Sequence, residues 1–141
     1  MLFRSENNMF QDKNLILHNA VITDGGQAST SYIDTLAAGD AIAPSANLSI
    51  QIPTAMAGMT SVTFELRTDS DPAFGTEVSL ISTGAVVVAS LTKGKSYLLP
   101  IPLGVKRYLR GYITSTGGAY SAGTVKMQIV LDGNKTIDKI L

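Results

Sequence analysis

The sequence contains no cysteine and no tryptophan, and it has one histidine among its 141 residues. The absence of cysteine excludes a disulfide scaffold, a thiolate metal site and a cysteine nucleophile. The stability of the fold therefore does not depend on the redox state of its surroundings. A chain of this length favours a single domain and can bury a sizeable core without covalent crosslinks.

Charge is also scarce. Charged residues make up 16% of the chain, and 11 basic residues balance 11 acidic ones, so the formal net charge is zero. A nucleic-acid binder needs surplus positive charge, and an electrostatic membrane anchor needs a basic cluster. We therefore expect neither nucleic acid nor a membrane as a partner. A weakly charged, neutral chain with 45% hydrophobic residues favours a protein that works while bound to another molecule.

The dominant pattern is the period-two alternation of half-buried β-strands. It is clearest over residues 47–52, 61–68 and 124–131, where every second residue is apolar. Further strands are expected over 15–22, 31–36, 78–82, 85–91, 96–101 and 108–114. About eight or nine strands separated by Gly, Pro, Asp and Ser predict an all-β, antiparallel sandwich or barrel. The segment TAMAGMTS at 54–61 favours, weakly, a short helical turn.

The two ends of the chain differ from this middle. Residues 1–14 are polar and rich in asparagine, with Phe3 and Phe10 among isolated apolar anchors, and residues 133–141 also look peripheral. We expect an extended N-terminal arm and a C-terminal tail around a domain at 15–132, with the arm ordered by a partner. The N-terminus is unlike a signal peptide, so synthesis in the cytoplasm is expected.

His18 is the one candidate for a histidine-dependent triad or a histidine-ligated metal. It lies in the apolar segment LILHNAVI, and no motif supplies it with a partner residue. We predict a strand histidine that is hydrogen-bonded to the backbone. A small β-sandwich hydrolase that uses His18 with an acid is the least favoured of the functional hypotheses.

The segment TDSDPAF at 68–74 holds two carboxylates two residues apart. A calcium loop would need oxygen ligands at several spaced positions, and Glu77 is the one glutamate nearby. The alternative is a turn in which aspartate side chains accept hydrogen bonds from backbone N–H groups. We favour the turn, and we expect no metal and no cofactor.

Tyr108, Arg110 and Tyr112 alternate with smaller or aliphatic residues near the end of the chain. If the aliphatic set faces the core, two tyrosines and an arginine face outward, and these residue types are enriched at interface hot spots. The opposite orientation, with the tyrosines packed inward, is equally compatible with the pattern. A loop of small residues follows, with Tyr120 near its tip.

Two segments together resemble a known family. Residues 61–80 contain a strand, a Thr-Asp turn and an Ala-Phe pair, and residues 97–132 contain RYLRGY at 107–112 and AYSAG at 119–123. In order and spacing they resemble the capsid cement proteins of tailed phages, the family represented in a Bordetella podophage. The resemblance covers roughly residues 45–132. Both ends of the chain are longer than the family pattern.

The resemblance implies a jelly-roll β-sandwich that decorates the outer surface of a phage head, without enzyme activity. Its partners would be the major capsid protein and a second copy of the chain, as a homodimer or alternatively a trimer. It makes residues 106–132 the last hairpin of the jelly roll, with a core formed by Leu109, Ile113, Val125, Met127, Ile129 and Leu131. We predict interface roles for Phe3, Phe10, Arg107, Tyr108, Arg110, Tyr112 and Tyr120.

An alternative function is a carbohydrate-binding or adhesive β-sandwich. Exposed tyrosine rings could stack on sugars, and the absence of tryptophan counts against this alternative.

Overall fold

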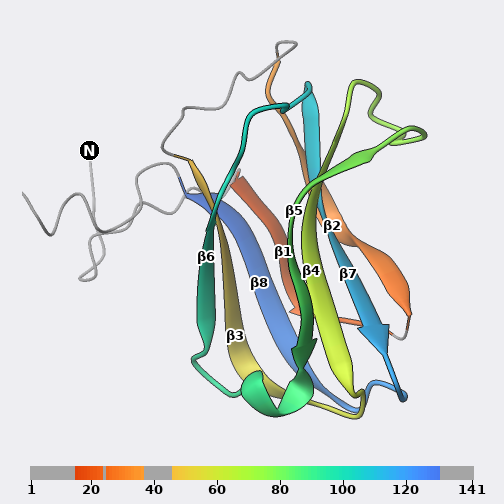
Figure 1. Cartoon of the computed structure of the whole chain (residues 1–141), viewed down its shortest axis with the longest axis vertical. Coiled ribbons are helices and arrows are strands. Elements are labelled where there is room, and N and C mark those ends of the chain that lie inside the picture. The colour runs from red at the N-terminus through yellow and green to blue at the C-terminus, as the bar shows by residue number, and fades with distance from the viewer. Residues whose placement is uncertain (1–14, 24, 37–45, 131–141) are drawn as a thin grey trace, which may run out of the picture.

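The computed structural model describes residues 15–23, 25–36 and 46–130, which form a β-sandwich (Figure 1). The strands are β1 (Ile16–Val21), β2 (Gly26–Asp34), β3 (Asn47–Ala57), β4 (Ser61–Asp69), β5 (Val78–Val87), β6 (Ser96–Pro100), β7 (Tyr108–Thr116) and β8 (Ala122–Val130), with a 3-10 turn, η2 (Val88–Ser90), after β5. The predicted all-β class is confirmed. The N-terminal arm at 1–14 with Phe3 and Phe10, Leu131 and the tail at 133–141 lie outside the described residues.

The eight strands form two antiparallel sheets of four, in the orders β1-β8-β3-β6 and β2-β7-β4-β5. Strands that follow one another in sequence mostly lie in opposite sheets, and both sheets combine early and late strands. This is the strand order of a jelly roll, so the predicted architecture is confirmed. Figure 1 shows the two sheets, with β6, β3, β8 and β1 in one layer and β5, β4, β7 and β2 in the other.

The prediction of a final hairpin is wrong. β7 lies between β2 and β4, whereas β8 lies between β1 and β3 in the other sheet, so the chain crosses between the two layers. The small residues at 117–123 are needed for this crossing, because it runs against the turn between β3 and β4. A Cβ on Gly118 would lie 2.4 Å from the carbonyl oxygen of Gly58, and a Cβ on Gly58 would lie 2.2 Å from the carbonyl oxygen of Ala119. Side chains at these glycines would collide with backbone.

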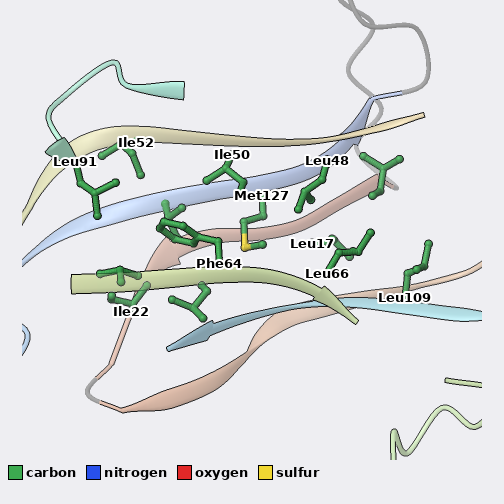
Figure 2. Close-up of a cluster of buried hydrophobic side chains, with 14 of the residues drawn as sticks. Leu17, Ile22, Leu48, Ile50, Ile52, Phe64, Leu66, Leu91, Leu109 and Met127 are labelled. Carbon is green, nitrogen blue, oxygen red and sulfur yellow. The ribbon is translucent and has the colours of Figure 1, made fainter. Parts of the chain in front are cut away.

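The core lies between the sheets and consists of aliphatic and methionine side chains with one phenylalanine, Phe64 (Figure 2). Strands from both sheets point apolar side chains into the same layer, as the alternation predicts. The predicted core residues that the structure describes are all buried: Leu109, Ile113, Val125, Met127 and Ile129.

Two strands are longer than predicted. β5 continues through Gly84, so the two strands expected over 78–82 and 85–91 are a single one that ends in η2. β3 continues to Ala57, so the helical turn expected at 54–61 is wrong. Pro53 is tolerated within β3 because β6 pairs only with Asn47 to Gln51, and the register with β8 shifts between Gln51 and Thr54.

Gln128 is one of the polar side chains that are buried against this pattern. Gln128 lies on the opposite face of β8 from the core residues Met127 and Ile129, yet it is fully buried. Within the described part of the chain, neither its amide oxygen nor its amide nitrogen has a hydrogen-bond partner. A buried amide without partners costs free energy because it has lost its bonds to water.

We expect Gln128→Met to raise the free energy of unfolding by about 1–2 kcal/mol, because an apolar side chain of similar volume removes this cost. Denaturant unfolding followed by circular dichroism measures the change. Gln51→Met, at a half-exposed position of neighbouring β3, is the control and should change stability by less than about 0.5 kcal/mol. A loss of stability in Gln128→Met would contradict the interpretation.

Candidate interaction surface

β7 positions the residues that the sequence singled out. Leu109 and Ile113 are buried in the core. Gly111 also faces the core, where a Cβ would lie 2.9 Å from Cε of Met127. Tyr108, Arg110 and Tyr112 therefore lie on the outer face of the sheet β2-β7-β4-β5, which decides between the two orientations that the sequence left open.

Two arginines lie directly opposite each other on this face, Arg110 on β7 and Arg67 on β4. Like charges in such a pair repel. Glu77, just before β5, bridges them: Nε of Arg110 donates to Oε1 at 2.9 Å, and Nη1 of Arg67 donates to Oε2 at 2.9 Å. Arg67 also binds Glu65, with 2.6 Å from Nη2 to Oε1. One carboxylate thus converts a repulsive pair into a connected network.

The pKa shifts of Glu77 and Arg67 favour the ionised form of both groups. Burial disfavours the charged form of Glu77, but hydrogen bonds from Arg110 and Arg67 outweigh it and lower the pKa of the carboxyl group. Burial likewise disfavours the charged form of Arg67, yet its bonds to Glu77 and Glu65 raise its pKa. Each charge is therefore compensated within the face, and the network offers no free charge to attract an ion.

Aromatic rings pack against the same guanidinium groups. The guanidinium carbon of Arg67 lies 3.7 Å from the ring centroid of Tyr112, and that of Arg110 lies 4.5 Å from the ring centroid of Phe74. Phe74, Tyr32 and Tyr108 contact one another edge to face, with centroid distances between 5.7 and 6.4 Å. We call this outer surface the Tyr–Arg face; its members are Tyr32, Glu65, Arg67, Phe74, Glu77, Tyr108, Arg110 and Tyr112.

The turn between β4 and β5 brings Phe74 and Glu77 to the face. Asp69 is buried and accepts hydrogen bonds from the backbone of Asp71, at 3.2 Å, and of Thr76, at 2.8 Å. Asp71 accepts a further bond from the backbone of Ala73. The predicted aspartate turn is confirmed. In the part of the chain that the structure describes, no group of three or more histidine, cysteine or acidic residues could hold a metal ion.

Arg107 lies beside the Tyr–Arg face and forms a two-pronged ion pair with Asp34. Its Nε donates to Oδ1 at 2.7 Å and its Nη2 to Oδ2 at 3.0 Å. The hydrogen bond from Arg107 lowers the pKa of Asp34. Arg107 also packs over the ring of Tyr108, 5.1 Å from its centroid. The pair joins the end of β2 to the start of β7.

Tyr120 does not project from the tip of a loop, as the sequence suggested, but packs against the sandwich. Its ring packs against the core cluster, and its hydroxyl donates to the carbonyl oxygen of Gly123 at 2.9 Å. Of the predicted interface residues, Arg107, Tyr108, Arg110 and Tyr112 are brought together, and Tyr120 is held apart from them. Residues that the sequence did not single out for this surface complete it: Tyr32, Glu65, Arg67, Phe74 and Glu77. They come from three other parts of the chain, and a local pattern gives no signal for that pairing.

His18 is buried and has a structural role. The backbone N–H of Thr30 donates to Nδ1 at 3.3 Å, and Nε2 lies 3.1 Å from the carbonyl oxygen of Val21. A neutral ring with its proton on Nε2 satisfies both contacts. Burial is the main cause of the lowered pKa of His18. The prediction of a histidine bonded to backbone is confirmed, and the ring links β1 to β2 across the two sheets.

A comparison with known protein families identifies the family of the chain. The model of the Bbp16 family matches residues 17–129. The chain belongs to the Bbp16 family. This is a Bordetella phage protein family, so the phage origin implied by the resemblance is supported and the protein is phage-related. No curated protein matches the sequence.

Among solved structures, the crystal structure of PirA aligns with a TM-score of 0.47 and 13% sequence identity, over 86% of this chain and 99% of that one. A similarity this low says nothing about function.

Over residues 15–23, 25–36 and 46–130, no helix is long and apolar enough to cross a membrane.

We expect Tyr108→Ala to lower the free energy of unfolding by about 2–4 kcal/mol, because the ring is covered by its neighbours and its removal leaves a cavity. Tyr32→Ala, at the half-exposed rim of the same cluster, should cost about 1 kcal/mol. Chemical denaturation of both variants measures the difference. Equal losses would contradict the packing described for the cluster.

We also expect the stability of the protein to fall between pH 7 and pH 5. Because the pKa of His18 is lowered by folding, the unfolded chain binds more protons in this range, and the free energy of unfolding rises with pH. Asp34, Asp69 and Glu77 have lowered pKa values and lose their contribution only in more acidic solution. Melting temperatures across the range measure the slope. His18→Gln should flatten it, and an unchanged slope would refute the assignment.

Proposed function

We propose that this protein is a capsid cement, or decoration, protein that binds the outer surface of the major capsid shell and bridges neighbouring capsomers. Membership of a Bordetella phage protein family over residues 17–129 is the observation that carries the proposal. The confirmed jelly roll agrees with the architecture that the sequence resemblance implied. The protein would be made in the host cytoplasm and reside on the outer surface of the virion head.

Such a protein acts through binding energy alone. A ligand that binds only the assembled shell stabilises it by about 2.7 kcal/mol when its free concentration is about a hundredfold above its dissociation constant. A cement that contacts two capsomers gains further, because releasing one contact leaves the other in place. A homodimer, or alternatively a trimer, would extend this bridge. The proposed function needs no catalytic residue and no cofactor.

The Tyr–Arg face supports a binding role because it is rigid before any partner arrives. Its arginines are fixed by Glu77 and Glu65 and stacked on aromatic rings. Ordered side chains lose little conformational entropy on association. The carbohydrate-binding alternative is less well supported, because Tyr108 is covered by its neighbours and Arg67 stacks on Tyr112.

We expect phage heads assembled without this protein to rupture, or to release DNA, at a lower temperature than complete heads. The physical reason is the loss of binding energy that is available only to the assembled shell. Thermal release of DNA, followed with a fluorescent dye, measures the difference. Supplying the purified protein to deficient heads is the control and should restore the rupture temperature. Identical rupture temperatures, with no binding of the added protein, would refute the proposed function.

A further inference from the structure

The outer face of the sheet β1-β8-β3-β6 is buried at one end. Gln128 and Val130 on β8 point away from the core, and so do Asn47 and Ser49 on β3, because their neighbours in each strand belong to the core cluster. These four residues are 0%, 1%, 7% and 3% exposed, in that order. Lys126, the preceding outward residue of β8, is only partly buried. A cover therefore lies over this end of the face and leaves the rest open.

The sheet itself cannot supply that cover. Ile16, Gln128, Ser49 and Leu98 form one row in register across the four strands. The serine beside Gln128 is too short to shield a glutamine side chain, and Leu98, one strand further, is itself 40% exposed. The described strands form two sheets and no third layer. A further segment of chain must lie over Gln128, because the end of a long side chain on a bare sheet face stays in water.

The buried end is where chain outside the described ranges joins this sheet. β1 and β3 begin there and β8 ends there, at the upper end of the layer in Figure 1. Residues 1–14 therefore enter at this end, and residues 131–141 leave from it. Residues 37–45 also arrive here, but they connect β2 in the other sheet to β3 and must span from one layer to the other. The two ends of the chain remain as candidates for the cover.

Reach and composition favour residues 1–14. This segment is joined through Leu15, which packs against the core, to Ile16 in the same row as Gln128. Fully extended, it can reach about 46 Å, whereas the four strands span about 14 Å. It contains Phe3 and Phe10, and residues 131–141 contain no aromatic residue. A buried aromatic side chain covers about 150–250 Å², so two of them can shield a patch of this kind.

The amide of Gln128 agrees with an apolar cover. Within the described part of the chain it has no hydrogen-bond partner, although it is fully buried. Phenylalanine rings exclude water and accept or donate no conventional hydrogen bond, so they would bury the amide in this way. The cost of leaving the amide unpaired is offset by the apolar area that the rings remove from water.

We infer that residues 1–14 fold back over the outer face of the sheet β1-β8-β3-β6 and cover Gln128 and Ser49, with Phe3 and Phe10 as the anchors. Gln128 is fully buried within a single chain, so the segment and the sheet belong to the same chain. The chain's own sheet then orders residues 1–14, where the sequence suggested a partner. The inference goes beyond the proposed function and does not depend on it. It leaves the Tyr–Arg face as the sheet face that is open to a partner.

The test uses the absence of cysteine, because one introduced thiol can then be labelled without interference from any other. Ser49→Cys reports on the covered face, and Thr63→Cys reports on the outer face of the other sheet. Each full-length variant is treated with a soluble aromatic disulfide, and the rate of labelling is followed by absorbance. We expect the thiol at position 49 to react about tenfold or more slowly than the thiol at position 63, because a covered thiol is inaccessible.

Adding Phe3→Ser and Phe10→Ser should raise the labelling rate of Ser49→Cys about tenfold or more, because the anchors of the cover are lost. The same substitutions should leave the rate of Thr63→Cys within about twofold. The matched control, Ile137→Ser with Ile140→Ser, removes two apolar side chains at the other end of the chain and should change neither rate. Thermal melting monitors folding, and the single variants Phe3→Ser and Phe10→Ser replace the double one if it does not fold.

An unchanged labelling rate of Ser49→Cys in the phenylalanine variants would overturn the inference. A rise caused by the isoleucine substitutions would make residues 131–141 the cover, and a rate that falls as protein concentration rises would make a second copy the occupant. Either result also overturns it. An equal rise at positions 49 and 63 would mean that residues 1–14 support the whole fold instead of covering this face, which is again incompatible with it. All of these measurements use the isolated protein, so they leave the test on phage heads independent.

Discussion

The buried carboxylate of Asp69 holds the turn between β4 and β5, and much of the neighbouring surface depends on that turn. Its oxygens accept hydrogen bonds from backbone N–H groups on both sides of the turn, which keeps its pKa low despite burial. The turn carries Phe74, which packs on Tyr32 and Tyr108, and leads to Glu77, which joins Arg67 to Arg110. One short polar anchor thereby fixes both the aromatic and the ionic part of the Tyr–Arg face.

The fold was predictable as far as it rests on alternation. Val62, Phe64 and Leu66 face the core because a strand places every second side chain on one face, and this property is local. Which strands become neighbours is not local. A glycine-rich connection can close a hairpin or cross between sheets, so nothing in the spacing of residues 106–132 revealed that β7 and β8 lie in opposite sheets. Gly84 likewise suggested a break that pairing with β4 overrides.

The candidate site was also predictable only where it depends on local sequence. Alternation correctly placed Arg110 and Tyr112 in one row on β7, and the aspartates at 69 and 71 predicted the turn. The sequence pattern did not predict which residues contact that row, because Glu77 follows a turn and Tyr32 comes from a distant strand. Tyr120 shows the opposite error: a tyrosine among small residues resembles an exposed anchor, but those residues are small because two backbones pass in contact there.

The position of β8 has a consequence for how the chain acquires its structure. β8 is the last described strand, and it lies between β1 and β3, so neither of those strands has its inner neighbour until the C-terminal part of the chain has been synthesised. Completing this sheet then needs pairings between residues about a hundred positions apart, which makes folding slow for a domain of this size. Until then the unfinished sheet exposes apolar strands with free edges, and such species aggregate readily. The architecture therefore favours completion of this sheet only after β8 has been synthesised.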